Sequence, residues 1–362
     1  MSIVATRMLE IRKQSEEMYL HNFAAKEYGA KEFYIQQTLL PNSVASRALQ
    51  DETPGSMGKT IKVPVLARNT SASVGSSRSC TINNNETSSA LVTLSWTTLT
   101  DGFIMYPERY TNNDIKYNQH WAANYQDMLL RLWNKMDELC VSDLGSYKTA
   151  IIGDTLNYTF ESSVVNALWN DRMDIIGDMS VFQRSNNYRG HLNLIGNMGL
   201  ISLANRIGRY GEYNEKDLRY EFGDKSGFIT SNIENASQKF TTMFCVPDGQ
   251  VAILSRVSRE EHARAKSAVD GHEWDEVMMP GFGNLKFGTH YYESVGDVHV
   301  ATGEDDMICS RAQHFGWAID IAFVHAYNPD ATTIPQPVIK ADIATGSNGQ
   351  IDVKVVAPIP VE

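Results

Sequence analysis

The segment Gly55-Ser-Met-Gly-Lys-Thr60 comes closest in this chain to a motif that binds phosphate. A P-loop needs Gly-x4-Gly-Lys-Ser/Thr between a strand and a helix. Here Thr53 occupies the position of the first glycine, and the residues after Thr60 are strand-like and include Pro64. Because no helix N-terminus follows, the backbone amides that would hold a phosphate are not brought together. The segment therefore predicts a turn that leads into a strand.

The other candidate sites are a lone Gly-x-Gly, an acidic run and scattered histidines. Gly281-Phe-Gly283 lacks the third glycine of a dinucleotide loop, and Glu304-Asp-Asp306 predicts an acidic loop, with weak cation binding as the alternative. The nine histidines show no helical zinc spacing. His272-Glu273 is expected on a solvated surface, and His290-Tyr-Tyr-Glu293 sends alternate residues to opposite faces of a strand. We therefore predict no catalytic residue, no cofactor, no metal and no enzyme.

The composition predicts a folded chain, and its net charge predicts that the chain does not attract nucleic acid. Of 362 residues, 42% are hydrophobic and 21% are charged, which is ordinary for a folded protein. The net charge of −11 opposes the counterion release on which binding to phosphates depends. The four cysteines are widely spaced, so we expect reduced thiols. The first residues lack a signal-peptide core, and no stretch is apolar over the length of a membrane helix, so no membrane partner is expected.

The elements that would position any site begin with an excursion over residues 57–140. Residues 59–66 and 91–96 are strand-like, and the Ser/Asn-rich tip 69–89 between them has almost no large apolar residue. Pro64 cannot donate to a ladder, so the first strand must lie at an edge or pair on one side only. A segment that extends away from its subunit and then returns buries little apolar surface against the rest of that subunit. We therefore expect it to pack against a neighbouring copy.

One long amphipathic helix follows, over residues 113–140, and Gly145 is expected to end this region. Its apolar side chains recur at three- and four-residue steps. They are Ile115, Trp121, Tyr125, Met128, Leu129, Leu132, Trp133, Met136 and Leu139. We expect this aromatic stripe to pack into a core rather than to form a ligand platform. A helix of this length would act as a structural spine.

The rest of the chain predicts a mixture of helices and strands, and the whole therefore an α+β fold. Helices are expected over residues 4–28, 161–176, 199–207 and 259–268, with an irregular linker over 41–58. Strands are expected over residues 239–246, 250–257, 286–295, 316–327 and 351–357. The turn Pro247-Asp-Gly249 joins the first two of these strands, and the strand 316–327 is apolar enough to be central in its sheet.

The order of these elements resembles that of the major capsid proteins of tailed bacteriophages, which have the Hong Kong 97-type shell fold. The most telling pieces are Gly58-Lys-Thr-Ile-Lys-Val-Pro-Val65, Phe103-Ile-Met-Tyr-Pro107, the helix to Cys140, and Trp317-Ala-Ile-Asp-Ile-Ala-Phe323. The resemblance covers nearly the whole chain. It rests on the order of elements, since this family has no short diagnostic motif.

The resemblance implies a domain organisation for this chain. Residues 1–56 would be an N-terminal arm and 57–108 an extended β-hairpin, the E-loop. Residues 109–148 would form a peripheral domain with the spine helix, 149–295 most of a mixed α/β axial domain, and 296–362 the return to the peripheral domain with C-terminal strands. The E-loop residues expected to contact a neighbouring subunit are Arg68, Asn69, Val74, Arg78, Ile82 and Asn84.

The resemblance also implies a function and a set of partners. Copies of the chain would form hexamers and pentamers of an icosahedral shell around double-stranded DNA, without reading its sequence. The virion would be its location and the host bacterial cytoplasm its place of assembly. A portal and a separate scaffolding protein are expected, since residues before 57 leave no room for a large fused scaffold. The tip has no lysine, so we expect the non-covalent stabilisation of the shell.

Three alternatives to a capsid remain open from the sequence. An encapsulin-like cellular compartment shares the fold but encloses an enzyme cargo, although its E-loop is usually more compact than this excursion. Another virion or tail component is the second alternative. A stand-alone α+β enzyme is the third, because active sites assemble from residues that are distant in sequence.

Overall fold

The computed structural model describes the chain in segments that form two units. The described residues are 60–66, 89–107, 117–148, 158–161, 163–168, 171–172, 174–185, 188, 190–207, 213–214, 219–221, 225–233, 239–257, 272–279, 282, 285–299, 307–325 and 337–344. The first unit comprises Met1–Val65, Leu91–Leu139 and Val251–Val324. The second comprises Leu66–Ala90, Cys140–Gln250 and His325–Glu362. Among the described residues, no helix is both long and apolar enough to cross a bilayer.

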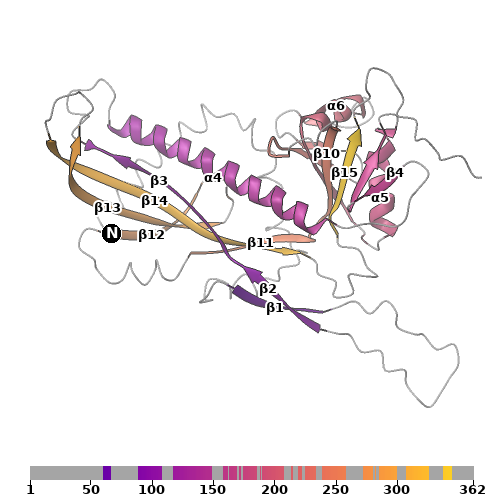
Figure 1. Cartoon of the computed structure of the whole chain (residues 1–362), viewed down its shortest axis with the longest axis horizontal. Helices are drawn as coiled ribbons and strands as arrows, with labels where there is room; N and C mark the ends of the chain where they lie inside the picture. Colours follow the sequence, from indigo (N-terminus) through magenta and orange to yellow (C-terminus); the bar gives the residue numbers. More distant parts are fainter. Residues whose placement is uncertain are drawn as a thin grey trace, which may run out of the picture. The chain divides into compact units, whose positions relative to one another are not determined.

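The first strands of the excursion pair with each other as predicted. Strand β1 (Thr60–Leu66) and strand β2 (Ser89–Ser95) form a two-stranded sheet, which is labelled in Figure 1. Pro64 lies within β1, and β2 is the strand that pairs with it in the described part of the chain. This confirms the prediction of pairing on one side. The predicted tip falls on residues outside those described, except Ser89.

The first unit contains a five-stranded sheet built around one very long strand. Its members are β3 (Thr97–Met105), β11 (Val251–Arg256), β12 (His272–Met278), β13 (Lys286–His299) and β14 (Met307–His325). Strand β14 pairs antiparallel with both β13 and β3, which confirms its predicted central place. It also starts earlier than predicted, because its first residues pair with the far end of β13.

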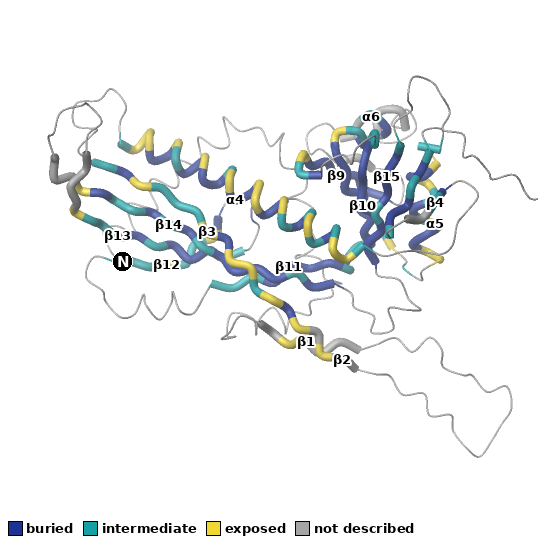
Figure 2. Tube along the Cα trace, viewed as in Figure 1, coloured by how far each residue is buried: buried dark blue, intermediate teal, exposed yellow. Residues whose placement is uncertain are grey.

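Helix α4 (Tyr117–Tyr147) covers one face of this sheet (Figure 1). Its 31 residues span about 46 Å at the usual rise. The predicted apolar stripe is buried from Trp121 to Met136, whereas Leu139 is only partly buried and Ile115 lies outside the described residues. Figure 2 shows the buried and exposed residues alternating along the helix. Trp121 packs edge-on against Phe103 of β3, with ring centroids 5.6 Å apart, and Tyr125 contacts Trp317 of β14. These contacts confirm that the aromatic stripe is core.

The helix ends later than the sequence predicts, because Gly145 lies inside it. Leu144 is fully buried beside this glycine. Asp143 accepts a hydrogen bond from His325 at 2.5 Å, and Tyr147 stacks on the same imidazole at 3.7 Å. These tertiary contacts outweigh the modest helix-breaking tendency of one glycine. The predicted first residues, 113–116, lie outside the described part.

The second unit is organised on an eight-stranded mixed sheet of order β4-β5-β15-β10-β6-β9-β8-β7. Its strands are β4 (Tyr158–Glu161), β5 (Val164–Ala167), β6 (Leu192–Gly196), β7 (Tyr213–Asn214), β8 (Arg219–Glu221), β9 (Lys225–Ile229), β10 (Lys239–Pro247) and β15 (Ile339–Ala344). Strand β10 pairs antiparallel with β15 and β6. The central strands are buried on both faces, as expected for a covered sheet.

Helices α5 (Asp174–Ser185) and α6 (Met198–Ile207) complete the core of the second unit. Helix α6 confirms the helix predicted near residue 199. Asn197 caps it, accepting hydrogen bonds from the amide of Gly199 and the hydroxyl of Thr241. Gly199 allows the start of α6 to pack closely on the backbone of β10, since a Cβ on Gly199 would lie 2.6 Å from the carbonyl oxygen of Phe240.

Two predictions about the second unit need correction. The helix predicted over residues 161–176 is wrong, because β4 and β5 form an antiparallel pair there and α5 starts only at Asp174. The β-branched side chains of Val164 and Val165 are buried in a strand between β4 and β15. The turn Pro247-Asp-Gly249 is confirmed by Gly249 at φ 74°, but it joins strands of different sheets.

The remaining sequence predictions fall partly or wholly outside the described residues. The helices over 4–28 and 259–268, the linker over 41–58 and the strand over 351–357 belong to this group. The strand predicted over 286–295 is confirmed and extends to His299. Strands β3 and β15 were not predicted, and each pairs with a strand that is distant in sequence.

Candidate functional site

The six residues predicted to contact a neighbour lie outside the described part of the chain. They are Arg68, Asn69, Val74, Arg78, Ile82 and Asn84, all between β1 and β2. The structure instead describes β1 and β2, the two strands that flank these residues. On β2, Leu94 is buried, whereas Thr93 and Ser95 are exposed and the Leu91 side chain is 66% exposed. The hairpin therefore presents a large apolar side chain that its own chain leaves uncovered.

The base of the hairpin is tied to the five-stranded sheet by Arg256 of β11. Its guanidinium lies 4.4 Å from the ring centroid of Trp96, the residue between β2 and β3. Its Nε donates to Asp320 of β14 at 3.1 Å, and both side chains are less than a tenth exposed. Thr98 of β3 donates to the other oxygen of Asp320 at 2.6 Å. Three strands therefore meet where the hairpin leaves the sheet.

A second polar cluster holds the start of α4 on the sheet. The Tyr117 hydroxyl donates to Gln313 at 2.5 Å, and Gln313 donates to Glu293 at 3.0 Å. Tyr291 and Arg311 also donate to Glu293. Burial opposes the charge of Glu293, but these hydrogen bonds and the guanidinium lower its pKa below the usual value. The cluster orients the helix and resembles no catalytic arrangement.

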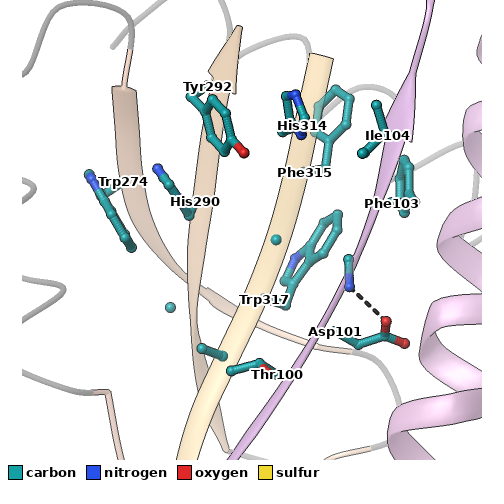
Figure 3. Close-up of a pocket in the computed structure, with 14 residues that line it drawn as sticks. Thr100, Asp101, Phe103, Ile104, Trp274, His290, Tyr292, His314, Phe315 and Trp317 are labelled. Atoms are coloured by element: carbon teal, nitrogen blue, oxygen red, sulfur yellow. Dashed lines mark hydrogen bonds between the residues drawn. The ribbon is translucent and has the colours of Figure 1, made fainter. Parts of the chain in front are cut away.

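The face of the sheet opposite α4 carries two cross-strand rows of residues. We call the first the ring row: His272, Tyr292, His314 and Ile104 are successive register partners on β12, β13, β14 and β3. The rings of Tyr292 and His314 are nearly parallel, with centroids 4.2 Å apart (Figure 3). Ile104 at the end of the row is 47% exposed.

The second row, which we call the glycine row, runs beside the first. It consists of Trp274, His290, Gly316 and Gly102 on the same four strands. The rings of Trp274 and His290 stack at 3.7 Å with 5° between their planes, as Figure 3 shows. The two glycines that continue the row have no side chain. The stack therefore stops at His290, which leaves a depression over β14 and β3.

This depression is the central part of a pocket of about 440 Å³, a size typical of ligand sites. Tyr292, His314 and Ile104 line one side, and Thr100 and Ala318 line the other. No Lys or Arg is among the described residues that line it. The described residues also contain no cluster of three or more His, Cys, Asp or Glu with metal-binding geometry. The pocket wall is thus mainly aromatic and polar without positive charge.

Two histidines at the depression, His290 and His314, have lowered pKa values. Burial, together with the neighbouring His272 and His314, lowers the pKa of His290 to about 4. Burial also lowers the pKa of His314. His272 and His290 share a hydrogen bond of 2.8 Å between Nδ1 and Nε2. One of these two rings donates this hydrogen bond and the other accepts it.

This face was not predicted from the sequence. His272 was expected on a solvated surface, yet its ring is half-buried and stacks on Tyr292 at 4.8 Å. His290 and Glu293 were expected on opposite faces of the strand, which the structure confirms: Glu293 joins the cluster at α4 and His290 joins the opposite face. Rings at every second position of two strands, at 272 and 274 and at 290 and 292, were the available signal.

Comparisons with known proteins found similarity only among solved structures. No family model matches the sequence, and no curated protein matches it. The capsid structure of cyanophage P-SCSP1u is similar at 9% identity and a TM-score of 0.44, covering 80% of this chain and 85% of that one. The capsid of Ralstonia phage GP4 is similar at 6% identity and a TM-score of 0.43, covering 81% and 85%. The cyanophage Pam1 capsid is similar at 10% identity and a TM-score of 0.43, covering 82% and 88%.

Proposed function

We propose that this chain is a major capsid protein, which assembles into the icosahedral shell of a tailed double-stranded DNA bacteriophage. The observation that carries the proposal is the β1–β2 hairpin. It pairs with neither of the larger sheets among the described residues, and it exposes Leu91. A two-stranded ribbon alone is marginally stable in water. A ribbon held firmly at its base by Arg256 and Asp320 is therefore suited to packing on another copy.

Within this proposal the elements take the roles of a Hong Kong 97-type subunit. The hairpin is the E-loop, and α4 with the five-stranded sheet is the peripheral domain. The eight-stranded sheet with α5 and α6 is the axial domain, and residues 1–56 are the N-terminal arm. The proposal places β11 and β12 in the peripheral domain and β15 in the axial domain, because these strands belong to the five-stranded and the eight-stranded sheet respectively.

The tip of the E-loop would make the contacts between subunits. The residues proposed for these contacts are Arg68, Asn69, Val74, Arg78, Ile82 and Asn84. They combine two cations, two amides and two apolar side chains, which suits a polar interface around a small apolar centre. Because the tip contains no lysine, the proposed shell is held by non-covalent contacts.

The proposed role is structural rather than enzymatic. Hexamers and pentamers of the chain would enclose double-stranded DNA in the virion, after assembly in the host bacterial cytoplasm with a separate scaffolding protein and a portal. The net charge of −11 supports this role, because an acidic wall does not adhere to DNA as it is packaged.

Expression of the full chain followed by negative-stain electron microscopy tests the proposal. Closed shells, capsomers or tubes are the expected result. A monodisperse monomer at high concentration would overturn the proposal. Mass spectrometry of any particles separates the alternatives, since an enclosed host enzyme would identify a cellular compartment instead of a capsid.

A further inference from the structure

The depression on the glycine row has the dimensions of a slot for aromatic rings. Neighbouring strands lie about 4.8 Å apart, so a ring placed over Gly316 would lie about that far from the ring of His290. Offset-stacked rings prefer centroid separations of about 4.5–7 Å. The ring row shows that rings on these two strands can stack, since Tyr292 and His314 occupy the same two strands with centroids 4.2 Å apart. The slot is thus one stacking position that this face leaves unfilled, with a second over Gly102.

The two glycines differ in what they permit. A Cβ on Gly102 would lie 2.3 Å from the carbonyl oxygen of Phe315, so this position requires glycine for backbone packing. A Cβ on Gly316 would have His290 as its nearest neighbour, at 3.8 Å. Backbone packing therefore does not explain the missing side chain at Gly316. What the glycine provides is an open position beside the ring of His290.

The chemistry of the slot favours an aromatic side chain over a nucleobase. No Lys or Arg lines the pocket to hold a phosphate, and Asp101 contributes to its wall. The whole chain carries a net charge of −11, which disfavours nucleic acid. The rim instead offers the exposed side chain of Ile104 and the neutral ring of His314. Such a rim suits an uncharged peptide segment.

The chain itself contains a segment of this chemistry outside the described residues. Residues 1–59 hold aromatic side chains only within 19–34: Tyr19, Phe23, Tyr28, Phe33 and Tyr34. The charges of that stretch cancel, with two lysines and two glutamates. Residues 67–88, between β1 and β2, and residues 345–362 at the other end contain no Phe, Tyr or Trp. The hairpin tip and the C-terminal residues therefore cannot supply the ring.

We infer that the slot over Gly316 and Gly102 binds an aromatic side chain from residues 19–34 of this protein, stacked on His290. The residues between 34 and β1 can span at most about 90 Å when extended. This reach exceeds the roughly 46 Å length of β13. The donor can therefore be the same copy or a neighbouring one. The inference does not depend on shell formation, because the slot lies within one unit of one chain.

Photo-crosslinking of the full chain tests this inference. The probe is p-benzoylphenylalanine in place of Ile104, whose exposed side chain borders the slot. After irradiation, mass spectrometry is expected to find the crosslinks within residues 19–34. Mixing copies of ordinary and heavy-nitrogen chain shows whether the same or another copy supplies the segment, and either result supports the inference. Crosslinks confined to other segments or to a second protein, or no crosslink at all, would overturn it.

Two changes examine the slot and its occupant separately. Gly316→Phe fills the slot from its floor, and we expect it to reduce the crosslink yield about two- to tenfold, in line with the energy of one stacked pair. Met278→Phe adds a ring to the same face away from the slot, and it should leave the yield unchanged. Replacing all five aromatic residues of 19–34 with Ser changes no described residue, and it should have the same effect as Gly316→Phe. Unchanged yield in the Ser variant would contradict the inference even if Gly316→Phe failed to fold.

The crosslink is measured on assembled particles and on dispersed chain alike. If the chain forms no shells but shows the crosslink to 19–34, the capsid proposal is contradicted and the slot is supported. Shells without that crosslink would support the capsid proposal and overturn the slot.

Discussion

Arg256 is the residue on which the base of the hairpin most depends. It holds Asp320 through a buried ion pair and lies over the ring of Trp96. Removing one partner of a buried pair leaves the other charge without compensation, and this costs more than the pair itself contributes. The position of the hairpin and the stability of the sheet are therefore coupled through one guanidinium.

We predict that Arg256→Ala lowers the free energy of unfolding by about 3 kcal/mol, because Asp320 stays buried. Urea denaturation followed by circular dichroism measures this change. Arg131→Ala is the matched control, since it removes an ion pair with Asp101 in which the arginine side chain is 55% exposed. That control should cost no more than about 1 kcal/mol. Equal losses in the two variants would show that burial does not govern the Arg256 pair.

His290 predicts a pH dependence of stability. Its pKa is lowered to about 4 in the folded chain from an ordinary value of 6.5, so the unfolded chain binds the proton more tightly. Stability is therefore fully present above about pH 6.5 and is lost as the pH falls toward about 4. The neighbouring groups are His272, Tyr292 and His314, of which His314 has a lowered pKa and acts in the same direction.

We expect the melting temperature to fall between pH 7 and pH 4.5, and to fall less in His290→Phe. The phenyl ring can stack on Trp274 but carries no titrating group. Differential scanning fluorimetry at several pH values measures the slope. His120→Phe, on the exposed side of α4, makes the same exchange away from the ring row and should keep the original slope. Identical slopes in all three proteins would count against protonation of His290.

At the scale of the elements, the glycines of helices α4 and α6 have different surroundings. A Cβ on Gly145 of α4 would meet nothing within 4 Å, whereas one on Gly199 of α6 would be 2.6 Å from the Phe240 oxygen. We predict that Gly145→Ala raises the free energy of unfolding by about 0.5–1 kcal/mol, through helix propensity. Gly199→Ala should lower it by about 1–3 kcal/mol through overpacking. Thermal or urea denaturation compares the two, and a loss of stability in Gly145→Ala would contradict the packing described for α4.

A change confined to the hairpin element can test folding and the proposed assembly separately. We predict that replacing residues 69–88 with a short Gly-Ser turn, which leaves β1 and β2 intact, yields a soluble chain with unchanged helix content. The same variant should form no regular shells, because the proposed contacts with the neighbour are gone. Circular dichroism and electron microscopy provide the two measurements. A drop in helicity or solubility would show instead that the tip contributes to the fold of its own subunit.

At the scale of the whole molecule, the acidic net charge opposes the binding of DNA. With a net charge of −11, we predict no measurable binding of a short DNA duplex at about 150 mM salt, with any dissociation constant weaker than about 10⁻⁴ M. Fluorescence anisotropy of a labelled duplex measures this. Micromolar binding that weakens steeply with salt would reveal a basic surface and would contradict an inner wall that does not adhere to DNA.

The sequence predicted those elements whose periodicity is strong and local. The stripe from Trp121 to Met136 specified α4, and the apolar run near Trp317 specified the central strand. It misassigned residues 161–176, where Val164 and Val165 are compatible with either helix or strand. It also could not place the end of α4, because the contacts of Tyr147 and Asp143 with His325 involve a residue far along the chain.

The sequence by itself determined the α+β class, the pairing of the hairpin strands, the buried stripe of the long helix and the absence of a recognisable catalytic motif. These follow from local periodicity and from residue chemistry, which a single chain displays directly. Only the tertiary structure decided that Gly316 stands between His290 and Gly102, and that Arg256 meets both Trp96 and Asp320. Cross-strand neighbours depend on the register between strands that are distant in sequence, and no local pattern specifies that register.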